Sequence, residues 1–404
     1  MNVFDRYAPC VREYIYGQDW RSLRGVQVAA GEAIFGSKEH VLLTSSTASG
    51  KTEAAFFPII TLLLESPPSS VGCIYIGPLK ALINDQFERL TPLCVTAGIP
   101  VRHWHGDVGQ THKARLMKHP SGILQITPES LEALLLHRHA AIPKLFGDLR
   151  FVVIDEVHAY DAYMSTYLRR VLTWLGAYDV PTILLSATLP PERRMELMHA
   201  YRGHDGSPHG RPSKRRDIPP ARRPSSDQPA YPLVTSLVRD KDMLPSYEAC
   251  AIAGAGTDVR LDFLPDDGET LVQTLSDLLS AGGCACVLRD TVARAQATYR
   301  MLRESLRGEL DGAQVRLVHS RFIAADRLQN DAALLELLGP DSSMRPSRLI
   351  VVGTQVIEQS LDIDFDVMIT DIAPVDLLLQ RMGRLHRHAR GEGQCERPER
   401  LRRA

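Results

Sequence analysis

Short apolar runs alternate with helix-like stretches along most of this chain, and that alternation constrains the fold more than any other feature of the sequence. In the first half the runs lie at residues 41–44, 73–76, 123–126, 151–154 and 183–185. After residue 232 the pattern restarts, with runs at 259–263, 286–288, 315–318, 349–352 and 367–369. Strands separated by helices form parallel sheets that are covered on both faces. The sequence therefore predicts an α/β protein with a first domain at 1–201 and a second at 233–404.

The segment between these two domains, residues 202–232, has a different composition. It is rich in Pro, Ser, Gly and His, and its basic side chains outnumber its acidic ones. Such a segment buries little apolar surface, so we interpret it as a solvated linker. The alternative, a basic arm that touches nucleic acid, stays open.

The overall composition is that of an ordinary globular protein, with 44% hydrophobic and 24% charged residues. No run is long and apolar enough to span a membrane and the N-terminus lacks a signal-peptide core, so we expect a soluble, cytoplasmic protein without a membrane partner. The seven cysteines lack metal-ligand spacing, and Cys284 and Cys286 are interpreted as buried strand residues.

The charge balance taken alone argues against nucleic acid as a partner, because 47 Lys and Arg face 48 Asp and Glu. The charges are unevenly spread, however. From Arg381 to the end there are eight arginines against three glutamates. A solvated tail and a contact with nucleic acid or a partner protein both explain that concentration.

A phosphate-binding loop is predicted between the run at 41–44 and the helical stretch at 53–64. Its residues are Ser45, Ser46, Thr47, Ala48, Ser49, Gly50, Lys51 and Thr52. In a tight strand-to-helix loop, backbone N–H groups and the helix N-terminus point at phosphates, Lys51 adds a positive charge, and Thr52 can hold Mg²⁺. Two residues depart from the usual pattern, because Ser45 replaces its first glycine and Ala48 stands where helicase loops usually have glycine.

Two adjacent carboxylates, Asp155 and Glu156, follow the apolar run at 151–154. A strand that ends in carboxylates delivers them to the carboxyl edge of a parallel sheet, where such folds bind ligands. There Asp155 can hold Mg²⁺, and Glu156 can orient and deprotonate an attacking water. The alternative is a strand that simply ends at solvent.

These residues resemble a superfamily 2 helicase, in which two RecA-like domains close over ATP and grip a nucleic-acid strand. The resemblance rests on D-E-V-H at 155–158, S-A-T at 186–188, G-T-Q-V-I-E-Q-S-L-D at 353–362 and Q-R-M-G-R-L-H-R at 380–387. From Asp155 onward the chain is similar to the CRISPR-associated helicase of type I interference systems. Upstream, P-L-K-A-L-I-N-D-Q at 78–86 and I-T-P-E-S-L at 126–131 resemble the long helicase-related family. The implied fold is α/β with two tandem RecA-like domains, each a parallel sheet with helices on both faces.

The resemblance implies that Lys51 and Thr52 contact phosphate and Mg²⁺, that Asp155 binds the metal, and that Glu156 orients the attacking water. It also implies further residues around ATP. Arg384 and Arg387 of the second domain would contact the γ-phosphate, a contribution that can reach about 10³ to 10⁵ in rate. A solvated basic face is the alternative for these arginines. Gln27 resembles the glutamine that reads adenine, because its amide both donates and accepts. His158 and Gln380 complete the implied nucleotide-binding set.

Contacts to a nucleic-acid strand are also implied by the resemblance. The candidate residues are Pro78, Lys80, Thr127, Pro128, Glu129, Thr354 and Gln355. Residues 127–129 also fit a strand end followed by a helix start, with proline and an acidic residue in the first turn, and both interpretations can hold together. Ser186 and Thr188 would couple the ATP site to the strand.

The function implied is an ATP-dependent helicase or translocase that moves 3′ to 5′ on single-stranded nucleic acid, with DNA favoured, in CRISPR-type antiviral defence. A repair helicase of the long helicase-related type and an ATP-gated clamp with little turnover are the alternatives. We expect two motor domains without the family's accessory domain and without intrinsic nuclease activity. The expected partners are a CRISPR surveillance complex and a separate HD nuclease subunit.

Overall fold

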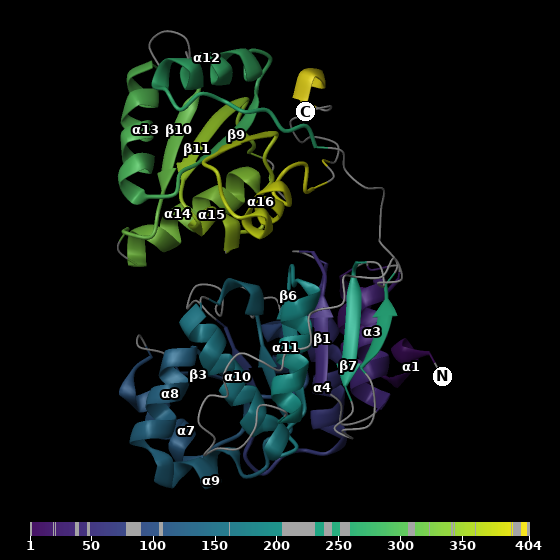
Figure 1. Cartoon of the computed structure of the whole chain (residues 1–404). Helices are drawn as coiled ribbons and strands as arrows, with labels where there is room; N and C mark the ends of the chain where they lie inside the picture. Colours follow the sequence, from purple (N-terminus) through teal and green to yellow (C-terminus); the bar gives the residue numbers. More distant parts are fainter. Residues whose placement is uncertain are drawn as a thin grey trace, which may run out of the picture. The chain divides into compact units, whose positions relative to one another are not determined.

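The computed structural model divides into two compact units, residues 1–254 and 255–404, which are described separately (Figure 1). The residues that it describes are 2–401 apart from 19, 21, 37–39, 47–48, 78–89, 105–107, 161, 204–230, 238–244, 251–258, 306–311, 323, 341, 343, 360, 389 and 391–396.

The first unit is built on an eight-stranded sheet in the order β3-β4-β2-β5-β6-β1-β7-β8. The strands are β1 (His40–Thr44), β2 (Val71–Ile76), β3 (Val101–Trp104), β4 (Gly122–Ile126), β5 (Phe151–Ile154), β6 (Thr182–Ser186), β7 (Leu233–Leu237) and β8 (Ser246–Ala249). The part from β3 to β1 is parallel, whereas β7 pairs antiparallel with β1 and β8 antiparallel with β7. The carboxyl ends of β1, β2, β5 and β6 therefore share one edge of the sheet.

Helices cover both faces of this sheet because its central strands are apolar on both sides. The helices are α1 (Val3–Arg6), α2 (Pro9–Gly17), α3 (Gly25–Gly36), α4 (Lys51–Glu65), α6 (Thr91–Thr96), α7 (Gln110–Lys118), α8 (Pro128–His137), α9 (Ile142–Phe146), α10 (Ala162–Ala177) and α11 (Pro191–Arg202). Val41 and Leu43 of β1 pack into the core under α1 to α6, and Leu42 packs into the core under α7 to α11. This alternation fixes β1, and the loop that follows it, between two packed layers.

The second unit holds a four-stranded parallel sheet in the order β10-β11-β9-β12. Its elements are α12 (Gly268–Leu278), β9 (Gly283–Leu288), α13 (Val292–Ser305), β10 (Gln314–Val318), α14 (Ala324–Leu338), β11 (Arg348–Gly353), α15 (Val356–Gln359), β12 (Val367–Thr370) and α16 (Val375–Met382). Cys284 and Cys286 are buried in β9, as the sequence predicted. Both units are thus parallel α/β sheets with a core on each face.

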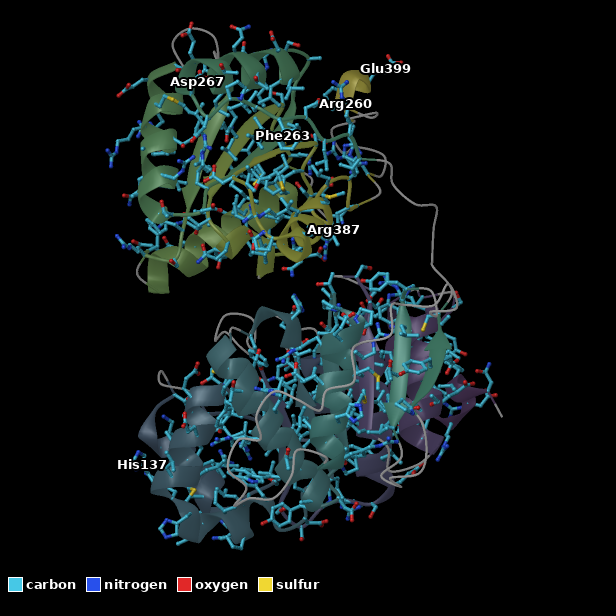
Figure 2. The ribbon with its side chains drawn as sticks, in the orientation of Figure 1. His137, Arg260, Phe263, Asp267, Arg387 and Glu399 are labelled. Carbon is cyan, nitrogen blue, oxygen red and sulfur yellow. The ribbon has the colours of Figure 1, made fainter. Side chains whose placement is uncertain are left out.

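The structure corrects two details of the predicted organisation. Residues 233–237 and 246–249 extend the sheet of the first unit, so the second unit begins at residue 255 and not at 233. Residues 259–263 form no strand, and the side chain of Phe263 (Figure 2) is 95% exposed. Apolar and polar residues alternate in this segment, as they do in many strands. A strand also needs a paired neighbour, however, and none of the described strands pairs with residues 259–263. Most of the predicted linker, residues 204–230, lies outside the described residues.

Candidate active site

The loop between β1 and α4 has the geometry of a phosphate cradle. Gly50 caps α4 in the left-handed region at a φ of 80°, which glycine adopts without strain. The Lys51 Nζ donates to the backbone oxygens of Ser45 at 2.7 Å and Ser46 at 2.9 Å, so the loop's own carbonyls hold the ammonium group. A positive charge and a helix N-terminus therefore converge on this loop. Thr52 follows in the first turn, whereas Thr47 and Ala48 lie outside the described residues.

The unusual Ser45 is accommodated as part of the sheet edge. Its side chain is buried, and its backbone N–H donates to the Ser186 oxygen at 3.1 Å. This bond ties the start of the phosphate loop to the end of β6. This backbone bond therefore holds the start of the loop beside the 186–188 segment.

Gln27 of α3 lies directly beside the phosphate loop. Its Oε1 accepts from the Arg24 N–H at 2.9 Å, whereas its buried Nε2 has no hydrogen-bond partner among the residues that the structure describes. A Cβ built on Gly50 would lie 2.6 Å from that Nε2. A buried donor without a partner costs free energy, so this atom is positioned for a ligand that accepts a hydrogen bond, as an adenine ring nitrogen does.

Asp155 and Glu156 come directly after β5 at the same edge of the sheet. Asp155 is buried, and its Oδ1 accepts from the Glu156 N–H at 2.8 Å. Burial and the neighbouring Glu156 charge raise the pKa of Asp155 to about 7, while the Tyr75 hydroxyl and Lys51 act in the opposite direction. The strand β6 lies between β1 and β5 in the parallel sheet, so the phosphate loop and the carboxylates follow nearby strands at the same edge.

Tyr75 contacts the candidate site, although the sequence did not single it out. Its hydroxyl, buried near the carboxyl end of β2, donates to Asp155 Oδ2 at 2.6 Å. A buried phenol needs a partner, and a tyrosine inside an otherwise apolar strand is the signal that could have revealed it. Together with the Glu156 N–H, it fixes both oxygens of Asp155.

His158 links Glu156 to the loop that follows β6. The Ala187 N–H donates to His158 Nδ1 at 3.2 Å, so Nδ1 is unprotonated and the ring proton sits on Nε2. Nε2 lies 3.1 Å from Glu156 Oε2 and donates to it. Glu156 itself adopts a left-handed φ of 51°, and this contact helps to hold its carboxylate. Within the loop, Ser186 Oγ donates to the Thr188 oxygen at 2.8 Å.

In the second unit, the predicted arginines are packed around α15 and α16. The buried Glu358 accepts from Arg381 Nε at 2.6 Å, and its backbone oxygen accepts from an Arg384 NH2 group at 2.7 Å. Arg387 (Figure 2) donates from Nε to Asp362 Oδ1 at 2.6 Å. Burial alone would raise the pKa of Asp362, but His388 and Arg387 hold it well below its usual range. These arginines are therefore embedded in the unit, which contradicts the alternative of a solvated basic face.

Two of the basic residues after position 387 also have an unexpected role, whereas Arg402 and Arg403 lie outside the described residues. Arg390 and Arg397 pair with the buried Asp364, at 3.3 and 2.8 Å, and both also pair with Asp366. They are neither a solvated tail nor free to contact nucleic acid, because they neutralise carboxylates that would otherwise be buried without a partner charge.

The remaining predicted residues divide by location. Thr127 caps α8, its Oγ1 accepting from the Ser130 N–H at 3.4 Å, with Pro128 and Glu129 in the first turn. Thr354 is buried at the end of β11, Gln355 is exposed, and Gln380 is buried. Pro78 and Lys80 lie outside the described residues, so their predicted roles stay predictions.

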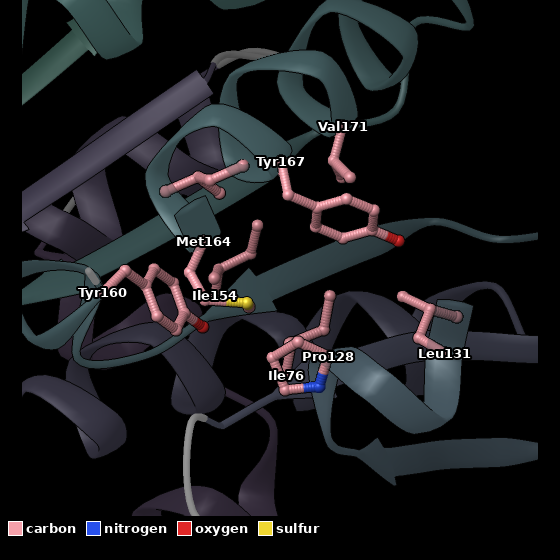
Figure 3. Close-up of a pocket in the computed structure, with 9 residues that line it drawn as sticks. Ile76, Pro128, Leu131, Ile154, Tyr160, Met164, Tyr167 and Val171 are labelled. Carbon is pink, nitrogen blue, oxygen red and sulfur yellow. The ribbon is translucent and has the colours of Figure 1, made fainter. Parts of the chain in front are cut away.

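A pocket opens between α8 and α10 beside the carboxylate pair (Figure 3). Its lining is almost entirely apolar and comes from Ile76, Pro128, Leu131, Ile154, Tyr160, Met164, Tyr167, Leu168 and Val171. A nucleotide's phosphates need cations and several converging donors, whereas this lining has no cation and only two tyrosine hydroxyls, so the phosphate loop and not this pocket is the candidate nucleotide site.

The described residues contain neither a membrane-spanning helix nor a ready-made cluster of metal ligands. No helix among them is long and apolar enough to cross a membrane. No group of three or more His, Cys, Asp or Glu side chains in the same residues is arranged to hold a metal ion. A site in which Thr52 and Asp155 share Mg²⁺ with phosphate oxygens is compatible with this result, because Mg²⁺ commonly takes only one or two protein ligands there.

Two parallel α/β units, one with a phosphate loop followed by a D-E-V-H segment, define the class to which the chain belongs. Residues 24–197 match the DEAD/DEAH box helicase family, and residues 281–390 match the family described as CRISPR-associated nuclease/helicase Cas3, C-terminal. By these matches the chain is similar to superfamily 2 helicases. Within that class it is similar to Cas3.

Individual relatives agree with both family matches. The CRISPR-associated nuclease/helicase Cas3 of Streptococcus thermophilus is 40% identical over 63% of this chain and 26% of its own length. The ATP-dependent helicase Lhr-Core of Methanothermobacter thermautotrophicus is 27% identical over 87% of this chain and 39% of its own length. The chain thus spans well under half the length of these relatives.

Solved structures give the same result. The crystal structure of T. fusca Cas3-ATP has a TM-score of 0.72 and 27% identity, with 94% of this chain and 45% of that chain covered. A chain in a CRISPR RNA-guided surveillance complex, pre-nicking, has a TM-score of 0.65 and 27% identity, with 92% of this chain and 43% of that chain covered. The predicted pair of RecA-like domains and the resemblance to a CRISPR-associated helicase are confirmed.

Proposed function

We propose that this chain is an ATP-dependent nucleic-acid helicase or translocase that works in CRISPR-type defence. The observation that carries the proposal is the grouping of Lys51, Asp155 and Glu156 at one sheet edge, because β6 alone separates β1, which leads into the phosphate loop, from β5, which leads into the two carboxylates. A cation beside two carboxylates suits a nucleotide triphosphate with its metal ion. The unpartnered Nε2 of Gln27 beside Gly50 suits the adenine of ATP.

Each residue then has a defined task. Lys51 and the loop N–H groups bind the phosphates, and Thr52 and Asp155 would hold Mg²⁺, which neutralises developing negative charge when bound. Glu156 accepts the proton of the attacking water, and His158 keeps its carboxylate in position. Arg384 and Arg387 supply positive charge to the γ-phosphate during the reaction.

The partner we propose is single-stranded nucleic acid, DNA in preference to RNA, with movement from 3′ to 5′. Strand contacts would come from Pro78, Lys80, the 127–129 segment, Thr354 and Gln355, with Ser186 and Thr188 coupling them to hydrolysis. A CRISPR surveillance complex and an HD nuclease subunit are the proposed protein partners, since the similar proteins are CRISPR-associated nuclease/helicases or part of such a complex.

A second function is favoured by one observation. The Lhr-Core helicase aligns with 87% of this chain, so a DNA or RNA helicase of that type is the alternative. Measuring ATP hydrolysis with no nucleic acid, with single-stranded DNA and with single-stranded RNA separates these possibilities. Stimulation by DNA supports the proposal, stimulation only by RNA favours the alternative, and binding without turnover indicates an ATP-gated clamp.

Substitution of Lys51 by alanine tests the phosphate cradle. A hydrogen bond to a charged group contributes about 1.5–3 kcal/mol, so the Kd for ATP should rise by roughly tenfold or more. Binding of a fluorescent ATP analogue measures the effect, with Lys118→Ala at the exposed end of α7 as the control. Equal affinity of Lys51→Ala and the unmodified chain would exclude this loop as the nucleotide site.

Substitution of Tyr75 by phenylalanine tests the support of Asp155. The ring that packs beside Phe56 is kept, but the hydroxyl that orients Asp155 Oδ2 is lost. Loss of a group that orients a metal ligand typically weakens metal binding about 10–100-fold. We therefore expect about tenfold higher Mg²⁺ to be needed for full ADP binding, with metal-free ADP binding unchanged. An unaltered Mg²⁺ requirement would refute the role of Tyr75.

A further inference from the structure

A hydrogen bond joins the loop after β6 to the residue pair that precedes β7. The Tyr231 hydroxyl donates to the backbone oxygen of Ala187 at 2.7 Å. The Tyr231 side chain is 44% exposed, so water could satisfy its hydroxyl if the loop were not there. Burial of the phenol raises its pKa, and the group therefore stays protonated and able to donate. None of the roles assigned above uses this contact.

The strand register explains why these two residues meet. Thr44 at the end of β1 pairs with Ser186 of β6 on one side and with Leu233 of β7 on the other. Ala187 follows Ser186, and Tyr231 precedes Leu233 by two residues. To reach Ala187, the Tyr231 side chain therefore crosses the end of β1, where the phosphate loop begins. The hydrogen bond thus links the start of β7 to the end of β6 across β1, at the edge that carries the site.

The same loop also leads to the carboxylate that we assign to hydrolysis. The Ala187 N–H donates to His158 Nδ1 at 3.2 Å, and His158 Nε2 donates to Glu156 Oε2 at 3.1 Å. Tyr231 and Glu156 are thus connected through one residue of the loop and one imidazole ring. A shift of Ala187 away from Tyr231 would move the donor that orients His158.

Tyr231 lies just before the last two strands of the first unit, which directly precede the second unit in the chain. After β7 the chain passes through β8, which ends at Ala249, and the second unit begins at residue 255. The β7–β8 hairpin is therefore the last part of the first unit before the chain enters the second. The Tyr231 hydroxyl ties the start of this hairpin to the 186–188 loop.

We propose that Tyr231 is a positioning residue for Glu156: its hydroxyl fixes the 186–188 loop and, through His158, the carboxylate that orients water. The position of the β7–β8 hairpin thereby sets the rate of hydrolysis. The inference rests on the proposed ATPase function, because it assigns Tyr231 to the same site. Tyr231 itself is not expected to touch ATP.

The test is Tyr231→Phe in the full chain, with Tyr201→Phe as the matched control. Tyr201 also donates its hydroxyl to a backbone oxygen of the same unit, that of Val180 at 2.9 Å, but at the start of β6. For Tyr231→Phe we expect the DNA-stimulated kcat to fall about tenfold, the effect of one hydrogen bond, with the Kd for ATP changed less than about twofold. We also expect faster amide exchange at residues 186–188 in Tyr231→Phe alone.

Two results would overturn this inference. One is a kcat for Tyr231→Phe equal to that of the unmodified chain. The other is an equal loss of kcat in Tyr201→Phe, because a general loss of stability would then explain both. Glu156→Gln distinguishes failure of the wider proposal: if that variant hydrolyses ATP at the normal rate, the proposed ATPase site itself is wrong.

Discussion

Replacing Glu156 by glutamine is expected to lower the ATP hydrolysis rate by at least about 10²-fold, the usual contribution of a general base. The side chains have nearly the same size, and the amide oxygen can still accept from His158 Nε2. The left-handed φ of 51° at this residue is carried by the backbone and is unchanged by the substitution. What the variant loses is the basic carboxylate that takes a proton from water. The Kd for ATP should therefore stay within about threefold of the original value, since the Lys51 contacts remain intact.

The hydrolysis rate is measured with saturating single-stranded DNA. The Kd is measured by equilibrium binding of a fluorescent ATP analogue. Glu65→Gln at the exposed C-terminal end of α4 is the matched control, because it makes the same chemical change in the same unit at the end of the helix opposite the phosphate loop. Normal turnover in Glu156→Gln would remove Glu156 from the mechanism. Loss of binding together with turnover would instead indicate that the substitution disrupts the site as a whole.

The sequence predicted every parallel strand of the two described sheets except β3, because the buried strands are continuous apolar runs. Residues 151–154 are all apolar and lie fully inside the first unit. The strand β3, V-R-H-W, contains two polar residues and is mostly half-buried or exposed, so its pattern was too weak to identify it. The placement of β7 could not be predicted either. Its pairing with β1 joins residues about 190 positions apart, and no local pattern encodes that choice.

The candidate site was predictable where one residue type performs a recognisable task at fixed spacing. The phosphate loop and Asp155-Glu156 are of that kind, since a glycine, a lysine and paired carboxylates carry their chemistry in the local sequence. Tyr75 offers one weak signal, a hydroxyl inside an otherwise apolar strand, and Tyr231 offers none. The role that we propose for each depends on a contact with Asp155 or Ala187 that folding creates.

The arginines of the second unit also make contacts that the sequence does not reveal. The resemblance singled out Arg384 and Arg387, but not the groups that hold them. Glu358 receives a bond from Arg381, and its backbone oxygen receives one from Arg384. A glutamate within an apolar stretch gives little indication of this role until α15 and α16 pack together. Glu358 thereby fixes the positions of two guanidinium groups.

Substitution of Arg384 by lysine is expected to reduce kcat by about 10³-fold, the lower end of what arginines contribute to phosphoryl transfer. Lysine keeps the charge but loses the planar fork that can bind a phosphate at two oxygens. In the present structure Arg384 donates to the neutral backbone oxygen of Glu358 at 2.7 Å. A bond to an anionic phosphate oxygen is stronger than a bond to a neutral carbonyl, so exchange of the Glu358 oxygen for the γ-phosphate is favourable.

The measurement is DNA-stimulated ATP hydrolysis together with thermal unfolding, and Arg303→Lys on the exposed face of α13 is the control. Because Arg384 is buried, Arg384→Lys will also lower the unfolding temperature by a few degrees, as expected for loss of a bond of about 1 kcal/mol. Comparing rates well below the unfolding transition separates this loss of stability from the loss of catalysis. A kcat within about threefold of the original would mean that Arg384 only maintains the packing of α15 against α16, and that the γ-phosphate charge is met by another cation.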